Sequence, residues 1–456
     1  MRSLPPDWGR RSMACINTND PYVREYCGEH PEAERMLSEL AGIKEARLRK
    51  YGLLQDGGSP AGLSTRDWFR KMKAVQVDLL RELKRVCDGN GLRLFLTYGS
   101  LLGAVRDGGR IDGDDDIDVA LMREDYDALV RLAPSFRAPY FLQDNYSDDC
   151  FYGGYMKLRN SETTAIVPQN WYVDCNEGIC IDIFPVDRCF GSELRERRKL
   201  RRIRTLQRLL FAKSYGFFAR FRDMPLPVWK AYKYAGKPFS RRKLLEELDD
   251  AFRSHDGRGG RLCIYTHYGK AGAAVYMDAA SFKEVVTVPY EGMDFSAPKG
   301  LKDVLEGFYG PDCLRPADRR EGLHAFYRPD VPYTAYKERF TRLFTSVPDG
   351  NKALVVFGDA ELFGEYTKRF PGAAYRPAAF IPCGDEGKPG ELDRLRECDP
   401  ASTFVVIAAF DFLSAEDEVR ALGFRDYAIY VYDRNWLFLP DLKSSRKKYL
   451  EEKQDK

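Results

Sequence analysis

Five aspartates follow a glycine-rich turn within one short stretch of the chain, residues 96–121. They are Asp112, Asp114, Asp115, Asp116 and Asp118. Two carboxylates about 4.5 Å apart repel each other by roughly 4 kcal/mol at an effective dielectric near 20, so gathering several of them is costly without a cation. Carboxylate oxygens are hard ligands that suit Mg²⁺ or Mn²⁺. The stretch therefore predicts a site for a divalent cation and for the phosphates that such a cation binds.

The hydrophobic spacing before the aspartates predicts the elements that position them. Apolar residues recur at helical spacing over 64–87, and a Gly-Asn-Gly sequence ends that helix. A short strand is expected over 92–97, followed by a tight turn at Gly99 and Ser100. One or two helical turns over 101–106 come next, and their free N–H groups can hold a phosphate.

The metal site needs acidic residues from more than one strand. We expect a strand over 116–121, in which alternation places Asp116 and Asp118 on one face. A second, distant strand over 179–185 carries Asp182 between isoleucines, and a lone buried aspartate is costly without a counter-ion. We therefore expect Asp116, Asp118 and Asp182 to be both the metal ligands and the catalytic carboxylates. This constellation is typical of nucleotidyltransferase-type folds.

Three sequence blocks carry a resemblance to a known family. Residues 99–106 read GSLLGAVR, residues 114–118 read DDDID and residues 181–187 read IDIFPVD. These blocks resemble the LicD family, which includes the fukutin-related proteins, and the likeness extends over roughly 64–336. The family commonly has Pro-Trp before its acidic run and a histidine after its Val-Arg pair, where this chain has Asp112-Gly113 and Asp107.

The resemblance implies a reaction and a donor. Members transfer a phospho-alcohol, such as phosphocholine or ribitol phosphate, from a CDP-linked donor to a hydroxyl of a cell-surface glycan or its lipid-linked precursor, and CMP leaves. Such transfer needs positioning and charge neutralisation more than a covalent nucleophile. Besides the three metal ligands, the residues expected to contact the substrate are Gly99, Ser100, Arg106, Asp115, Lys157 and Arg159.

Several individual assignments stay open at this point. The hydroxyl proton is accepted by Asp182 or by a neighbouring acid such as Asp115 or Asp187. Arg106 either neutralises charge as CMP leaves or forms a salt bridge to the aspartates. The rival activity is an NTP-dependent nucleotidyltransferase, which releases pyrophosphate. A catalytically silent scaffold for glycan assembly, with no turnover, is the alternative from another class.

A basic segment over 195–243 is interleaved with aromatic residues and has few acids. One interpretation is peripheral contact with an anionic membrane surface or a lipid-linked acceptor. The other is a helical hairpin that packs on the catalytic core. No recognition motif accompanies the charge, so nucleic acid is not an expected partner.

Composition limits the class of protein to which the chain can belong. The 456 residues are 44% hydrophobic with a net charge of +3, which suits a folded protein of more than one domain. The pattern of expected strands and helices predicts the α/β class. No paired metal-ligand cysteines and no apolar leader are seen, so we expect free thiols and a cytoplasmic location, peripheral at the inner membrane face. The expected segments are a polar extension at 1–63, a mixed-sheet catalytic domain at 64–345 with a basic helical insertion at about 192–250, a Rossmann-like parallel-sheet module at 352–438 for docking or homo-oligomer formation, and a charged tail at 439–456.

Overall fold

The computed structural model divides into two compact units. The first comprises Met1–Ala165, Cys175–Arg208 and Ser240–Asp330, and the second Ile166–Asp174, Leu209–Phe239 and Val331–Lys456. Segment 209–239 thus belongs to the second unit, whereas the sequence prediction placed it with the catalytic domain. The structure describes residues 67–438 except 149–150, 152, 168–174, 216–218, 222–223, 267–273, 315–324, 336–350, 371, 384–390, 410–411 and 431–435. The expected extension at 1–63 and tail at 439–456 lie outside these residues.

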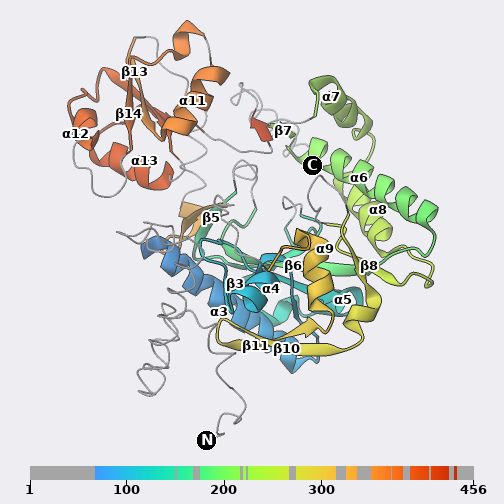
Figure 1. The fold of residues 1–456 in the computed structure, drawn as a ribbon. Helices are drawn as coiled ribbons and strands as arrows, with labels where there is room; N and C mark the ends of the chain where they lie inside the picture. The colour runs from blue at the N-terminus through green and yellow to red at the C-terminus, as the bar shows by residue number, and fades with distance from the viewer. Residues whose placement is uncertain are drawn as a thin grey trace, which may run out of the picture. The chain divides into compact units, whose positions relative to one another are not determined.

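A mixed sheet forms the centre of the first unit (Figure 1). Its strands follow the order β10-β11-β1-β2-β6-β4-β3, and β8 and β9 continue from β6. The pairs β1–β11 and β2–β6 are parallel, and the other pairs of this sheet are antiparallel. The bounds are β1 Phe95–Leu96, β2 Asp118–Met122, β3 Tyr140–Gln143, β4 Met156–Asn160, β6 Ile179–Arg188, β8 Arg261–Cys263, β9 Tyr276–Asp278, β10 Val285–Tyr290 and β11 Met293–Pro298.

The long helix α3 (Asp67–Gly89) packs against this sheet along its apolar stripe. Phe69, Met72, Leu79 and Leu83 are fully buried at helical spacing. The helix expected over 64–87 is therefore confirmed, and it extends two residues further, to Gly89. The remaining elements of this unit are α4 Tyr98–Arg106, α5 Arg123–Arg131, α8 Arg241–Arg253, α9 Leu301–Tyr309, and a separate two-stranded sheet of β5 Thr164–Ile166 and β12 Phe326–Arg328.

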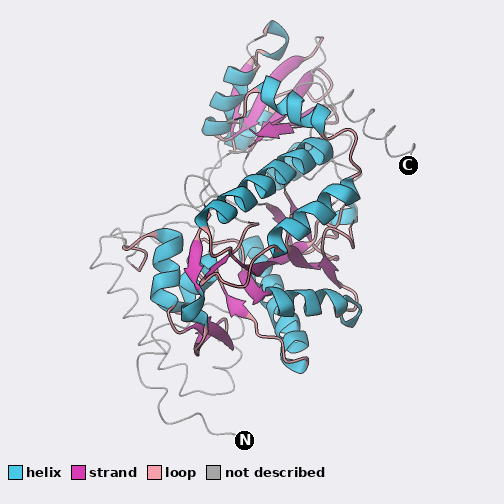
Figure 2. Ribbon diagram, turned by 90° about the vertical axis from the view of Figure 1, so that its right-hand side faces the viewer, coloured by secondary structure: helices cyan, strands magenta, loops and turns pink. Residues whose placement is uncertain are grey.

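The basic segment is helical, as expected. It contains α6 (Glu193–Tyr215), α7 (Leu226–Ala235) and α8, which are labelled in Figure 1. Figure 2 draws the helices of the chain in cyan. Ser240 caps α8 by accepting a hydrogen bond from the backbone N–H of Lys243 at 3.1 Å. None of the described helices is long and apolar enough to cross a lipid bilayer.

The second unit contains a parallel sheet with the order β14-β13-β15-β16, which confirms the parallel module expected from the sequence. Gly358 ends β13 with φ +155, and a Cβ there would lie 2.0 Å from the carbonyl oxygen of Ala408. Strand packing alone therefore requires this glycine. The bounds are β13 Ala353–Gly358, β14 Ala379–Pro382, β15 Thr403–Ala408, β16 Tyr427–Ile429, α11 Ala360–Arg369, α12 Glu391–Arg396 and α13 Phe412–Ala421, with β7 Ala219–Phe221 pairing β17 Trp436–Phe438.

The two sheets confirm the predicted fold class. A mixed sheet with helices carries the three motif blocks, and a separate parallel sheet follows it in the chain. In the second unit, the apolar core lies between the strands and α11, where Leu354, Val356, Phe404 and Val406 alternate along their strands.

Candidate active site

The glycine-serine pair lies inside the first turn of α4 and not in a separate turn before it. The helix begins at Tyr98, whose φ of +43 is left-handed and costs a residue with a side chain about 1–3 kcal/mol. The ring of Tyr98 packs against Phe184 and Phe308, with centroids 5.3 and 4.5 Å apart. These aromatic contacts hold the strained residue and fix the place where α4 starts.

Gly99 lets the acidic loop approach this helix. A Cβ atom at Gly99 would lie 2.9 Å from Oδ2 of Asp114, closer than real Cβ contacts allow. A side chain at this position would therefore require the carboxylate of Asp114 to shift. The expected contact between the Gly99 backbone and a donor phosphate stays a prediction.

Ser100 is buried, and its hydroxyl contacts other parts of the protein. Its Oγ accepts a hydrogen bond from the backbone N–H of Asp118 at 2.9 Å, and the hydroxyl of Tyr290 lies 3.4 Å away. Ser100 thus fixes the first residue of β2 relative to α4. This hydrogen bond means that Ser100 positions a candidate metal ligand. The expected contact of its side chain with donor phosphate stays a prediction.

Three consecutive aspartates form the acidic cluster of the site. Asp114, Asp115 and Asp116 each have a carboxylate oxygen within 4.8 Å of the other two. Asp114 and Asp115 are buried, and Asp116 is half-buried. Three carboxylates at this spacing match the hard oxygen donors that Mg²⁺ and Mn²⁺ prefer.

A row of charged side chains crosses three neighbouring strands beside this cluster. Asp118 on β2 is in register with Asp182 on β6, and Asp182 is in register with Lys157 on β4. Side chains in register on adjacent strands share a face of the sheet. Lys157 Nζ lies 2.5 Å from Oδ1 of Asp182. The two strands thus bring Asp118 and Asp182 together, as the sequence analysis expected.

The expected set of three carboxylates is not gathered into one group. β2 begins at Asp118, so Asp116 belongs to the loop before the strand and not to the strand itself. In the described part of the chain, Asp116 groups with Asp114 and Asp115 and not with Asp118 and Asp182. The site therefore has two acidic parts, the cluster in the loop and the Asp118–Asp182 pair on the sheet.

Lys157 remains an ammonium ion in this environment. Burial by itself would lower its pKa, but the carboxylate of Asp182 more than compensates, and the pKa of Lys157 is raised. The thiol of Cys180 lies 3.8 Å from both Lys157 Nζ and Asp182 Oδ1, and burial raises its pKa. Lys157 is thus a fixed positive charge at the Asp118–Asp182 pair, next to a neutral thiol.

The two arginines expected at the substrate have protein partners. Arg159 is fully buried and donates from Nε to Oε1 of Gln143 at 2.5 Å and from Nη1 to the carbonyl of Gly178 at 2.6 Å. Arg106 pairs with the adjacent Asp107, with Nη2 and Oδ2 2.6 Å apart. Contact with a donor phosphate therefore fits Lys157 better than Arg159. The salt bridge of Arg106 is made to Asp107 and not to the acidic run.

A buried polar network that the sequence did not predict supports the acidic loop. Gln76 on α3 donates from Nε2 to the backbone carbonyl of Asp115 at 2.8 Å and accepts from Nη1 of Arg110 at 2.9 Å. The hydroxyl of Tyr327 donates to Oδ2 of Asp115 at 2.8 Å. Asp115 is thus a positioned carboxylate. The signal that could have revealed Gln76 is its place as a polar residue in the apolar stripe of α3.

Lys73, one turn before Gln76 on α3, also faces the acidic loop. Its pKa is lowered to about 8, first by burial and then by the charge of Arg110, while Asp112, Asp114 and Glu291 act in the opposite direction. Lys73 and Arg110 therefore place positive charge next to Asp114 of the acidic cluster.

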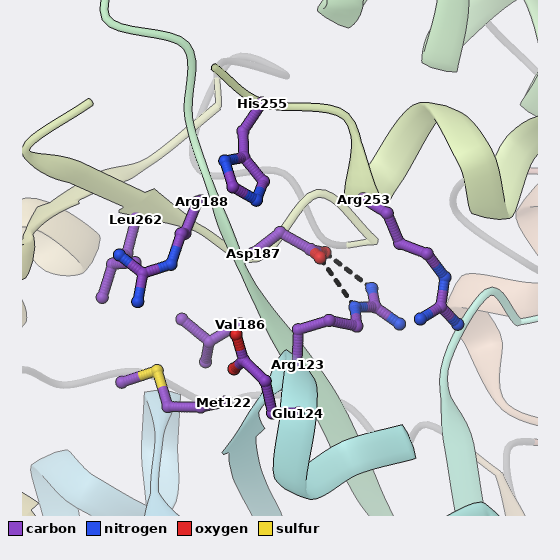
Figure 3. A pocket seen from close by; sticks show the side chains of 9 residues that line it. All are labelled: Met122, Arg123, Glu124, Val186, Asp187, Arg188, Arg253, His255 and Leu262. Atoms are coloured by element: carbon purple, nitrogen blue, oxygen red, sulfur yellow. Dashed lines mark hydrogen bonds and ion pairs between the residues drawn. The ribbon is translucent and has the colours of Figure 1, made fainter. Parts of the chain in front are cut away.

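Asp187 lies apart from the site, which excludes it as the proton acceptor considered above. It is five residues beyond Asp182 on β6, an odd offset that places it on the other face of the sheet. Both of its oxygens accept from Arg123, with Nε and Nη2 each 2.7 Å away (Figure 3). This pair lines a pocket of about 220 Å³ near the ends of β2 and β6, together with Arg188, Arg253 and His255.

The comparison with known families matches the part of the chain that holds this site. Residues 91–192 match the family model described as LicD/FKTN/FKRP, nucleotidyltransferase domain. No curated protein matches the chain. The match covers α4, the acidic cluster and Asp182, but less of the chain than the span 64–336 over which the sequence resembles the family. It supports a transferase activity. The resemblance is confirmed for residues 91–192, which match the LicD-type nucleotidyltransferase domain.

Proposed function

We propose that the protein transfers a phospho-alcohol from a CDP-linked donor to a hydroxyl of a cell-surface glycan, or of its lipid-linked precursor, and releases CMP. The observation that supports this most is the row formed by Lys157, Asp182 and Asp118, which lie in register on three adjacent strands. It combines a fixed cation with two carboxylates on the sheet that carries the family motifs. A diphosphate with a divalent cation matches that mixture of charges.

The donor set fits Mg²⁺ or Mn²⁺. Three carboxylate oxygens of Asp114, Asp115 and Asp116 lie within 4.8 Å of one another, and Asp118 and Asp182 supply two more carboxylates on the sheet. We propose that the cation is held by both acidic parts of the site, by Asp116 of the loop cluster and by Asp118 and Asp182 on the sheet. Tyr327 and Gln76 hold Asp115 in the loop. When bound, the cation would neutralise the charge of the diphosphate and of the departing CMP.

The chain's own residues would bind the donor, orient the acceptor hydroxyl and neutralise the charge of the phosphates. The acceptor oxygen attacks the phosphorus of the phospho-alcohol, the bond from that phosphorus to the bridging oxygen breaks, and CMP leaves with the electron pair. The hydroxyl proton passes to a site carboxylate, for which we propose Asp182. Lys157, held at Asp182, would stabilise negative charge on the transferred phosphate. Asp187 takes no part, because it lies on the other face of the sheet.

A donor panel tests the proposal and its rivals. The full chain is incubated with Mg²⁺ and either CDP-choline, CDP-ribitol, CDP-glycerol or an NTP, and the products are separated by chromatography. We expect one CDP-alcohol to yield CMP, slowly without acceptor. Pyrophosphate from an NTP would favour the nucleotidyltransferase alternative, for which the name of the matching domain is the supporting observation. No product from any donor would favour the silent scaffold.

Three further expectations concern the oligomeric state of the protein, its location in the cell and its acceptor. Assembly into a homo-oligomer through the parallel-sheet module stays a prediction, as does a location at the cytoplasmic face of a membrane. The acceptor class, a surface polysaccharide such as a teichoic acid or a lipopolysaccharide or its lipid-linked precursor, also stays a prediction.

A further inference from the structure

Helix α7 exposes an apolar face. Four of the eight large hydrophobic side chains that are exposed in the described part of the chain lie within 226–239: Leu226, Val228, Tyr234 and Phe239. Isolated exposed apolar residues are common on protein surfaces, but a contiguous group of them marks an interaction surface. The four exposed apolar side chains within one short helix and the turn after it therefore indicate a binding surface.

The other side of α7 is already packed, so the exposed face is a second apolar face. Trp229 is buried with Ala212 and Met224, and Tyr232 packs against the same cluster. At about 100° per residue, Tyr234 lies about 140° around the helix from Trp229, and Leu226 and Val228 lie about 60° and 100° from Trp229 on its two sides. The exposed apolar side chains therefore border the side of α7 that faces away from Trp229. A helix that is apolar on both faces is normally covered on both.

The charge of this segment indicates what covers it. Residues 224–245 contain six lysines and arginines and no aspartate or glutamate. Lys230 is exposed on α7, and Lys237 follows it with Nζ 5.0 Å from the centroid of the Tyr234 ring. Lysines flanking apolar and aromatic side chains are typical of helices that lie in the interface of an anionic bilayer, where the lysine stems stay with the apolar side chains.

Arginines in the rest of the basic segment form ion pairs within the protein. Helix α6 lies beside α8 (Figure 1), and Arg202 of α6 forms an ion pair with Glu247 of α8. Arg195 and Arg197 are paired with Asp256 and Glu193. These arginines therefore favour the packed-hairpin interpretation for α6 and α8, whereas α7 combines exposed lysines with exposed apolar side chains.

We propose that the exposed face of α7 docks on an anionic lipid bilayer. Leu226, Val228, Tyr234 and Phe239 enter the interface, and Lys230 and Lys237 contact the lipid headgroups. This inference does not rest on the proposed reaction.

Vesicle binding of the full chain tests the proposal. We expect the protein to co-sediment with vesicles of phosphatidylcholine and phosphatidylglycerol, to bind less as salt rises, and to bind pure phosphatidylcholine at least tenfold more weakly. Absence of binding to the anionic vesicles at low salt would overturn the proposal, whatever the donor panel shows.

Matched variants locate the surface. Val228 and Leu226 are 43% and 42% exposed, and Val285 and Leu314, both in the first unit, are 37% and 39% exposed. We expect L226E/V228E to lose at least tenfold in binding to anionic vesicles and V285E/L314E to stay within twofold of the wild type. Equal binding by the two double variants would contradict the proposal.

A second variant covers the case in which L226E/V228E does not fold, as checked by circular dichroism. K230Q/K237Q removes two exposed charges without touching the apolar core, and we expect severalfold weaker binding to anionic vesicles. Unchanged binding by K230Q/K237Q overturns the charge part of the proposal. Light scattering gives the other outcome: a wild-type dimer that L226E/V228E dissociates, without vesicle binding, would make this face an interface between copies.

Discussion

Replacing Asp118 or Asp182 by asparagine is expected to reduce CMP release about a thousandfold. Each change keeps the size of the side chain and removes one negative charge from the pair that β2 and β6 hold in register. Charge stabilisation at a site of phosphoryl transfer contributes on the order of 10²–10³ per group, and loss of a metal ligand costs at least as much. The measurement is the rate of CMP release with the donor identified by the panel.

Two controls separate chemistry from folding. Asp88 is an exposed aspartate on α3 that pairs with Lys84, and Asp88→Asn should leave the rate within twofold of the wild type. Asp182→Asn also leaves Lys157 buried without its partner, so the double variant Asp182→Asn/Lys157→Met should restore stability but not activity. Activity above a tenth of the wild-type rate in Asp118→Asn would count against its proposed role.

Asp187→Asn is expected to destabilise the first unit by about 3–5 kcal/mol while leaving the chemistry in place. The carboxylate is buried and accepts from Arg123 at 2.7 Å through both oxygens, and removal of one partner strands a buried charge. The double variant Asp187→Asn/Arg123→Met should recover part of the loss. Urea unfolding followed by tryptophan fluorescence measures the change.

An exposed ion pair serves as the comparison. Glu284 and Lys299 pair at 2.5 Å at the surface, and Glu284→Gln should cost less than about 1 kcal/mol. If Asp187→Asn instead stops CMP release without lowering stability, Asp187 would be the proton acceptor and its placement on the other face of the sheet would be contradicted.

Alternation along strands made the centre of the site predictable from sequence. Asp118 and Asp182 each lie among apolar residues of a strand. The side chain of a strand residue points to one face of the sheet, and a buried charge on that face needs a charged partner or a cation. Helical spacing fixed α3 in the same way. The parallel sheet of the second unit followed from its alternating strands and helices.

The supports of the site could not be predicted in this way, because they join residues far apart in the chain. Tyr327 reaches Asp115 across 212 residues, and Gln76 reaches it across 39. No local pattern encodes such contacts. The same reason explains the error at Asp116, because the start of β2 depends on its pairing with β1 and β6 and not on the alternation of its own residues.

Binding of Mn²⁺ to the full chain, followed by electron paramagnetic resonance, tests most directly whether the acidic residues hold a divalent cation. With CDP-alcohol present, we expect the wild type to bind the ion at the site, Asp116→Asn and Asp182→Asn to bind it at least tenfold more weakly, and Asp88→Asn to bind it as the wild type does. Equal Mn²⁺ binding by all four proteins, or none by the wild type, would contradict the account.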